Sequence, residues 1–137
     1  MSAPPPEPAL TEPERPEGEP VIRTIAMPAD TNPNGDIFGG WLMAQMDLAG
    51  GSAALRRASG RVATVAVDSM TFHHPVKVGD EVSIYARVLG IGRSSIRVFI
   101  EAWRRARTGG LQRVTSATFV YVAIGPDGRP RPVDPAP

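Results

Sequence analysis

Hydrophobic and polar residues recur along this chain in two different patterns. Short runs rich in apolar and β-branched residues predict β-strands over residues 21–27, 61–73, 81–89, 94–105 and 113–124. Between the first and second of these runs, the pattern turns helical over residues 40–57. One helix followed by consecutive strands with short links points to an α+β domain with an antiparallel sheet.

The predicted helix is unusual because it is apolar on nearly every side. Between Trp41 and Gly51 only Gln45 and Asp47 are polar. A helix of this kind is expected to be buried, and a sheet curved around it would bury it. Gly50 and Gly51 each cost roughly 1 kcal/mol relative to Ala inside a helix. We expect that cost to be tolerated where another backbone packs very close.

The two ends of the chain differ in composition from its middle. Residues 1–20 hold seven Pro and five Glu, with almost nothing apolar. Such a segment buries too little surface to offset its ordering entropy, so we expect it to be disordered. The Pro-rich residues 125–137 are expected to behave likewise after an opening turn. One domain over residues 21–124 remains.

The composition excludes several kinds of chemistry. The chain has no Cys, so disulfides, thiolate nucleophiles and Cys-based metal sites are excluded. No stretch approaches the ~18 consecutive apolar residues of a membrane span. The N-terminus lacks the basic start and the apolar run of a signal peptide. We therefore expect a cytoplasmic protein without membrane insertion.

The net charge of +1 conceals an uneven distribution. Residues 21–124 carry twelve Lys or Arg against seven Asp or Glu, whereas residues 1–20 carry five Glu against one Arg. A basic body suits a polyanionic partner such as a nucleotide or a phosphate ester, although a solvated surface would have the same composition. Nucleic acid is not the expected partner, because only eight aromatic residues exist and most alternate into the core.

Gly39 and Gly40 stand directly before the predicted helix. They let the chain turn sharply and leave the backbone N–H groups of the first turn pointing outward. Together with the helix dipole, these groups form a site for an anion or a developing oxyanion. An ordinary glycine-rich junction between a loop and a helix would have the same sequence.

Asp47 lies about two turns inside the predicted helix, so it cannot cap the helix N-terminus. Asp is a mediocre helix former and is rarely buried without a partner. A carboxylate among Met43, Met46 and Leu48 is typical of a general base or a nucleophile. The alternatives are that this flank of the helix reaches solvent or that Asp47 caps a neighbouring backbone.

Three further polar features are weaker candidates. Asn32 precedes a Pro in a turn, where Asn is commonplace. Arg93, Ser94 and Ser95 offer a guanidinium and two hydroxyl groups, which suit phosphate, although a polar hairpin turn is the simpler explanation. Arg61 belongs to a basic cluster at the end of the helix, where it also complements the helix dipole.

His73 and His74 are the only histidines in the chain. Neighbouring residues of a strand point to opposite faces, so the pair cannot bind one metal ion from that strand. No Asp, Glu or His at metal-binding spacing surrounds them. We therefore expect no metal site and no Ser-His-Asp arrangement.

These residues together resemble the acyl-CoA thioesterases of the hotdog-fold superfamily, of the bacterial broad-specificity and cytosolic long-chain acyl-CoA hydrolase type. The matching stretch is residues 27–47, MPADTNPNGDIFGGWLMAQMD. The resemblance covers about residues 21–131 and continues through residues 60–62, 70–72, 75–80, 93–96, 101–103 and 119–123. The departures are the Pro-rich N-terminal tail, a short C-terminus without an extra helix, and the pair His73-His74.

The resemblance implies a five-stranded antiparallel sheet wrapped around one long central helix. It implies hydrolysis of acyl-CoA to a free fatty acid and CoA, with Asp47 as the general base or the nucleophile. The active-site Asn of the family falls on Asn32, and its oxyanion N–H falls on Gly39 or Gly40.

The resemblance also has implications for partners. Asn32 and Asp47 are implied to come from different subunits of a dimer, within a homohexamer built as a trimer of dimers. The CoA phosphates are implied to lie near Arg93, Ser94 and Ser95, and we group Arg61 with them. No cofactor is expected, because CoA is part of the substrate.

Two other functions belong to the same fold. A protein that binds acyl-CoA without hydrolysing it, as a sensor, would carry a DNA-binding module, for which residues 1–20 are too short and too rich in Pro. A hydratase or dehydratase would need Asp and His close together near the central helix, but no His lies before residue 73.

Overall fold

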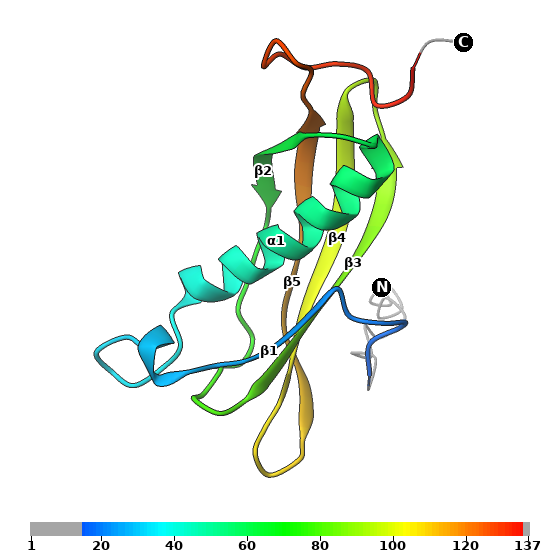
Figure 1. Cartoon of the computed structure of the whole chain (residues 1–137). Helices are drawn as coiled ribbons and strands as arrows, with labels where there is room; N and C mark the ends of the chain where they lie inside the picture. The colour runs from blue at the N-terminus through cyan, green and yellow to red at the C-terminus, as the bar shows by residue number, and fades with distance from the viewer. Residues whose placement is uncertain (1–14, 136–137) are drawn as a thin grey trace, which may run out of the picture.

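The chain folds into one curved sheet with a single long helix lying against it (Figure 1). The computed structural model describes residues 15–135. Its elements are β1 (Ile22–Ile25), the 3-10 turn η1 (Pro28–Asp30), α1 (Gly39–Ala58), β2 (Val62–Asp68), β3 (Glu81–Ile91), β4 (Ser95–Arg105) and β5 (Leu111–Ala123). The strands pair antiparallel in the order β1-β3-β4-β5-β2. The prediction of an α+β fold with five antiparallel strands is confirmed.

The second strand is shorter than predicted. β2 pairs with β5 from Val62 to Asp68. Ser69 then adopts a positive φ of 30°, which ends the extended conformation. The residues after it form a loop that returns to the sheet, where the His73 N–H donates to the carbonyl oxygen of Val114 at 2.8 Å. His73 and His74 are therefore loop residues and not strand residues.

Helix α1 lies across the sheet (Figure 1). The residues of α1 that are buried are small or apolar. The helix has no side-chain cap at its start and ends at Ser59, whose φ of 53° is left-handed. Its buried residues are Leu42, Met46, Ala49, Gly50, Ala54 and Ala58. Small residues on this flank let the helix approach the sheet closely. Within residues 15–135, no helix is both long and apolar enough to cross a membrane.

The core lies between α1 and the sheet. Ile96, Val98, Ile100 and Ala102 of β4 are fully buried on one face, as their alternation predicts. Burying an aliphatic side chain of this size contributes roughly 1.5–3 kcal/mol, so β4 is a main source of stability. The sheet bends around the helix at β-bulges, which interrupt the register of three of its four strand pairs.

One flank of α1 is not buried, which corrects the prediction of a helix enclosed on nearly all sides. Leu48 is 62% exposed and Met43 is 39% exposed. The neighbouring edge strand β2 also presents apolar side chains to solvent, with Val65 57% exposed. The sheet of one chain covers a single flank of the helix, so a second surface is needed to cover the other.

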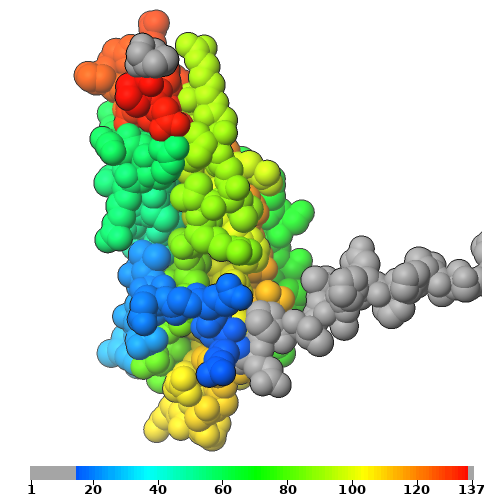
Figure 2. All heavy atoms as spheres, turned by 90° about the vertical axis from the view of Figure 1, so that its right-hand side faces the viewer, coloured from blue at the N-terminus to red at the C-terminus, as the bar shows by residue number. Residues whose placement is uncertain are grey.

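The C-terminal segment also differs from its prediction. Residues 125–135 pack across the end of the molecule, although their Pro content predicts disorder. Val133 is only 3% exposed, and its N–H donates to the Arg93 carbonyl oxygen at 2.8 Å. The Arg131 N–H donates to the Ala123 carbonyl oxygen at 2.9 Å. The buried valine and these two backbone hydrogen bonds offset the conformational entropy that the segment loses on ordering. This loss is reduced because Pro already restricts the unfolded chain. Figure 2 shows this segment, in red, at the end of the molecule where α1 ends.

The predicted N-terminal tail falls mostly outside the described residues, which begin at residue 15. Residues 15–20 are described and lead into β1. The Val21 N–H donates to the Ile84 carbonyl oxygen at 2.8 Å, which extends the pairing of β1 with β3 by one residue. Glu17 and Glu19 border a cavity of about 420 Å³ together with Arg87 and Arg113 of the sheet. The acidic segment therefore lies beside basic side chains.

Candidate active site

Asp47 sits on the flank of α1 that faces β2 and β5. The Thr64 hydroxyl of β2 donates to Asp47 Oδ1 at 2.7 Å. The Tyr121 hydroxyl of β5 lies 3.0 Å from the same oxygen and 3.1 Å from the Asp47 carbonyl oxygen. Among residues 15–135, no group donates to Asp47 Oδ2. One carboxylate oxygen is therefore held in place, while the other is available to a water molecule or a substrate.

Tyr121 acts as a donor and not as an acid. The pKa of its hydroxyl is raised far above the ordinary value, first by burial and then by the negative charge of Asp47 and the hydrogen bond to it. The phenol therefore keeps its proton at neutral pH and above. A protonated hydroxyl can always donate, so it holds the Asp47 carboxylate in one orientation.

Gly50 makes this arrangement sterically possible. A Cβ atom at position 50 would overlap both the Tyr121 hydroxyl oxygen and Ile100 Cδ1. At Gly51 the nearest atom, Tyr121 Cε1, would be at an ordinary contact distance of 3.7 Å. The close approach expected at these glycines thus occurs at Gly50, and the approaching atoms belong to sheet side chains instead of a backbone.

Thr64 and Tyr121 are site residues that no sequence pattern identified. They lie 17 and 74 residues from Asp47 in the chain. Their contact with Asp47 depends on how α1 is placed on the sheet. The only hint in the sequence is that Tyr121 carries a polar group within an otherwise apolar strand, and such a group usually finds a partner when buried.

The start of α1 presents unpaired backbone donors, as predicted for Gly39 and Gly40. Both glycines are exposed, and within the described residues their N–H groups have no acceptor. The Phe72 ring lies over Gly39, 3.5 Å from the position of a Cβ atom. The free N–H groups and the positive end of the helix dipole point to a site for negative charge.

Asn32 lies in the loop before α1 and uses its side chain there. Its Oδ1 accepts hydrogen bonds from the backbone N–H groups of Asn34 at 2.9 Å and Asp36 at 3.1 Å. Within residues 15–135, its side-chain amide group donates to no acceptor. The carbonyl end of this side chain shapes the loop, and the NH₂ end is available to another group.

One chain does not bring all these candidates together. Eight residues of helix separate Gly39 from Asp47, a distance of about 12 Å along the axis. A catalytic base must approach its proton within about 3 Å, directly or through one water. Asp47 and the free N–H groups of the same chain therefore cannot act on a single small acyl group.

The predicted phosphate-binding residues lie at the opposite end of α1. Arg93 and Ser94 lie in the β3–β4 turn and Ser95 begins β4; the Arg93 carbonyl oxygen accepts from Val133 of the C-terminal segment and the Ser94 carbonyl oxygen from Ala123 of β5. Arg61 precedes β2 and borders a cavity of about 930 Å³ between the end of α1 and the C-terminal segment. In the described part of the chain, neither Arg61 nor Arg93 has a side-chain partner, so both guanidinium groups are available to an anion.

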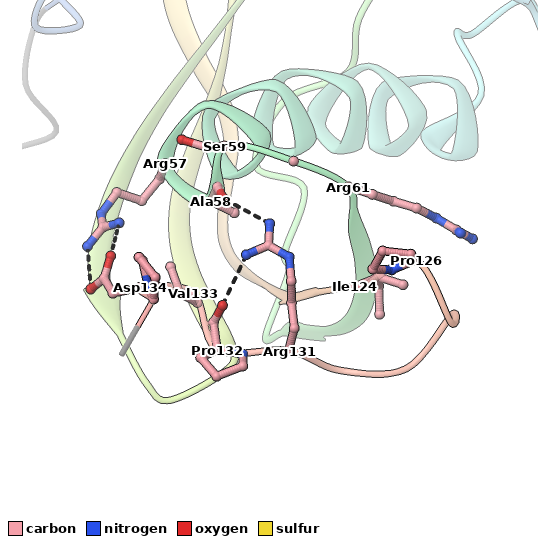
Figure 3. Close-up of a pocket in the computed structure, with 13 residues that line it drawn as sticks. Arg57, Ala58, Ser59, Arg61, Ile124, Pro126, Arg131, Pro132, Val133 and Asp134 are labelled. Atoms are coloured by element: carbon pink, nitrogen blue, oxygen red, sulfur yellow. Dashed lines mark hydrogen bonds and ion pairs between the residues drawn. The ribbon is translucent and has the colours of Figure 1, made fainter. Parts of the chain in front are cut away.

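Two other arginines at this cavity are engaged in holding the C-terminal segment (Figure 3). Arg57 pairs with Asp134 through two hydrogen bonds of 2.7 and 3.1 Å. Arg131 donates to the carbonyl oxygen of Ala58 at 2.8 Å, which satisfies an end group of α1. Figure 3 shows Arg61 pointing away from both of them. The cluster therefore divides into structural arginines and a free one.

Metal chemistry has no candidate site in the described residues. Within residues 15–135, no three His, Cys, Asp or Glu side chains are grouped so that they could hold a metal ion.

Comparisons with known proteins show what this chain resembles. The family model described as "Thioesterase superfamily" matches residues 34–110. The acyl-CoA thioester hydrolase YciA of Salmonella typhimurium is 54% identical over 122 residues, which are 86% of this chain and 92% of that protein. YciA of Escherichia coli is 52% identical over 120 residues, covering 85% of this chain and 91% of that protein.

Solved structures give the same result. The hexameric thioesterase y2039 from Yersinia pestis is 54% identical, with a TM-score of 0.84 over 89% of this chain and all of that one. HI0827, a hexameric broad-specificity acyl-coenzyme A thioesterase, is 45% identical, with a TM-score of 0.83 over 91% of this chain and 87% of that one. The hexameric hotdog fold thioesterase Cj0915 of Campylobacter jejuni has 41% identity and a TM-score of 0.81, over 88% of this chain and 93% of that one. The prediction of a hotdog fold is thereby confirmed.

Proposed function

The chain belongs to the thioesterase superfamily and is an acyl-CoA thioester hydrolase, and we propose that Asp47 is its catalytic carboxylate. The observation that carries this proposal is the pair of hydroxyl donors, Thr64 and Tyr121, on one oxygen of Asp47. They orient the carboxylate and, within residues 15–135, leave its other oxygen without a hydrogen-bond donor. Among the solved structures similar to this chain is a variant of HI0827 in which one aspartate is replaced by alanine.

The chemistry can follow two courses. As a general base, Asp47 takes a proton from water, and the resulting hydroxide attacks the thioester carbonyl carbon. The C–S bond then breaks, and the CoA thiolate takes the proton back. As a nucleophile, Asp47 attacks the same carbon and expels the thiolate, and water then hydrolyses the mixed anhydride. Single turnover in isotopically labelled water distinguishes them, because only the second course puts label into the Asp47 carboxylate.

The oxyanion requires donors that Asp47's own chain does not provide nearby. We propose that the N–H of Gly39 or Gly40 of a second subunit stabilises it, since these donors are free and lie about 12 Å from Asp47 in one chain. A donor of this kind is worth about 3–4 kcal/mol of barrier. Asn32 of the second subunit would then orient the water or the carboxylate through its free NH₂ group.

The assembly proposed for this chain is a dimer as the smallest active unit and a trimer of dimers as the whole enzyme. The exposed apolar flank of α1 and the apolar side chains of edge strand β2 support a dimer, because contiguous surface of this kind marks an interface. Three solved relatives are hexamers.

Arg61, Arg93, Ser94 and Ser95 are proposed to bind the phosphates of CoA. This proposal is supported by the side chains of Arg61 and Arg93, which have no partner in residues 15–135. Arg57 and Arg131, in contrast, are engaged in hydrogen bonds. It stays a prediction from the sequence that the enzyme needs no cofactor and no metal. Its cytoplasmic location stays a prediction as well.

Replacing Asp47 tests the proposal. Asp47→Ala removes the carboxylate but leaves Tyr121 its second acceptor, the carbonyl oxygen of residue 47, so the fold should persist. We expect kcat/KM for acyl-CoA, measured by thiol release, to fall at least about 100-fold, the lower end for loss of a general base.

Asp68→Asn is the matched control, since Asp68 is an exposed carboxylate at the end of β2. It should leave kcat/KM within about twofold, because surface substitutions are usually mild. Parental activity in Asp47→Ala would remove the assignment. A wild-type protein that binds acyl-CoA without releasing thiol would instead support the non-catalytic alternative.

A further inference from the structure

A cavity of about 300 Å³ opens beside the start of α1. Its walls are apolar and include Phe38, Leu42, Phe72 and Val76. Phe38 and Phe72 are 49% and 44% exposed, so two aromatic rings flank the opening without being covered by their own chain. Gly39, whose N–H has no partner in the described residues, also borders this cavity.

The only polar side chains in the lining are the imidazoles of His73 and His74. The backbone of His73 is fixed by its hydrogen bond to Val114, so the pair stays at the wall. Neither imidazole has a hydrogen-bond partner in residues 15–135, and the lining contains no charged side chain. The nearest ion pair in the chain, Lys77 with Asp36, lies outside the lining. A polar group that enters the cavity would therefore meet these two imidazoles and nothing that competes for them.

The cavity lies where the acyl chain of a bound substrate would extend. This step rests on the proposed function, in which the thioester carbonyl sits at the N–H of Gly39 or Gly40. Since Gly39 borders the cavity, the carbon chain attached to that carbonyl would enter it. Ligand pockets measure about 300–1,000 Å³, so this cavity is at the small end and suits a short chain.

We propose that His73 and His74 select short acyl-CoAs whose acyl chain ends in a carboxylate. A terminal carboxylate accepts hydrogen bonds from the imidazole N–H groups and is favoured by the positive end of the α1 dipole. A terminal methyl group offers the two imidazoles no hydrogen-bond acceptor. A site built for hydrogen bonding discriminates strongly against analogues that lack the matching group.

A matched pair of substrates tests the selection. Glutaryl-CoA and pentanoyl-CoA have five acyl carbons each and differ only in a terminal carboxylate or methyl group. We expect kcat/KM to be higher for glutaryl-CoA in the wild-type enzyme. Replacing both imidazoles, in the double variant of His73→Leu and His74→Leu, should lower the ratio of the two kcat/KM values about tenfold, the effect of losing hydrogen bonds to a charged group. An unchanged ratio would overturn the proposal.

Two further variants identify the cause of a changed ratio. His74→Gln keeps a hydrogen-bond donor at the wall, so it should retain most of the preference that His74→Leu loses. Lys77→Leu removes a nearby cation outside the lining and should leave the ratio unchanged. If Lys77→Leu moves the ratio as much as the imidazole variants do, general electrostatic attraction replaces the two histidines as the cause.

A binding measurement separates this proposal from the proposed function. The chain has only two histidines, so a protein with ¹⁵N-labelled His gives two sets of imidazole signals in an NMR spectrum, one from each ring. Glutaryl-CoA added to Asp47→Ala should shift both signals, whereas CoA alone should shift neither. If the enzyme hydrolyses pentanoyl-CoA but binding of glutaryl-CoA shifts no imidazole signal, the proposed selection by the histidines is wrong. The thioesterase function would still stand. Failure of the wild type to hydrolyse either substrate would overturn the proposed function, and the selection with it.

Discussion

At the scale of single residues, the hydroxyl of Tyr121 joins α1 to the sheet at Asp47, the proposed catalytic carboxylate. Tyr121→Phe keeps the ring in the core and removes one donor to Asp47. Hydrogen bonds to charged groups contribute roughly 1.5–3 kcal/mol, so kcat should fall about tenfold or more, with a smaller loss of stability. Thiol release together with urea unfolding measures both effects.

The raised pKa of Tyr121 also predicts a dependence on pH. Below the ordinary tyrosine pKa of 10.0 the hydroxyl is protonated in the folded and the unfolded chain, so it adds no pH dependence. Above it only the unfolded chain releases the proton, and the folded state loses stability as pH rises. Tyr121→Phe should reduce this alkaline loss, which unfolding measured above pH 10 would reveal. An equal loss in both proteins would contradict the assignment.

Gly50 and Gly51 offer a comparison within one helix turn. Gly50→Ala puts a methyl group against Tyr121 and Ile100, so we expect a loss of about 1–3 kcal/mol through overpacking and a lower kcat through displacement of the hydroxyl. Gly51→Ala meets only an ordinary contact and should gain up to about 1 kcal/mol from helix propensity. Denaturant unfolding and kcat of both variants test the contrast. Equal effects at the two positions would show that the contact at Gly50 is not what requires glycine.

At the scale of elements, the C-terminal segment is held mainly by burial. Val133 is nearly inaccessible, so Val133→Ala should cost about 1–2 kcal/mol, since two buried methyl groups are lost at roughly 0.8 kcal/mol each. Asp134→Asn breaks an exposed ion pair with Arg57 and should cost less stability than Val133→Ala, because solvent screens the pair. Hydrogen exchange at the amides of Arg131 and Val133 measures the local effect. Faster exchange in Asp134→Asn than in Val133→Ala would reverse this ranking.

The same ion pair responds to acid. Arg57 lowers the pKa of Asp134 in the folded chain through its hydrogen bonds and its charge, against a smaller effect of burial. The ion pair therefore stabilises the folded state at pH values above the unfolded pKa of Asp. This stabilisation is lost as pH falls through the lowered pKa of Asp134. The Arg57–Asp134 contact is expected to persist at neutral pH.

At the scale of the whole molecule, the active site is proposed to be shared between subunits. Asn32→Ala would disturb the loop, because Oδ1 accepts two backbone N–H groups. Asn32→Asp keeps that acceptor and replaces the NH₂ donor by a negatively charged acceptor oxygen, so it removes the donor with less disturbance of the loop. Inactive Asp47→Ala and Asn32→Asp chains, once mixed and exchanged, should regain about a quarter of wild-type activity, since half of the dimers would hold one intact site of two. No recovery after confirmed subunit exchange would contradict a shared site.

Much of the local structure could be predicted because local spacing determines it. The alternation of Ile96, Val98 and Ile100 predicted a strand with one buried face, and the glycines at 39 and 40 predicted a helix start with free donors. Asp47 was conspicuous as a charged residue in an apolar helix. Its partners Thr64 and Tyr121 could not be identified, because they lie on different strands and meet Asp47 only when α1 packs on the sheet.

The amino-acid sequence by itself determined the type of each element, the antiparallel class of the sheet and the candidate carboxylate, because these depend on short-range spacing and on the succession of elements along the chain. Tertiary structure alone decided which flank of α1 stays exposed, that Val133 orders a Pro-rich end, and that Thr64 and Tyr121 hold one oxygen of Asp47. Each of these depends on contacts between residues distant in the sequence, whose free energy appears only when the sheet closes over the helix.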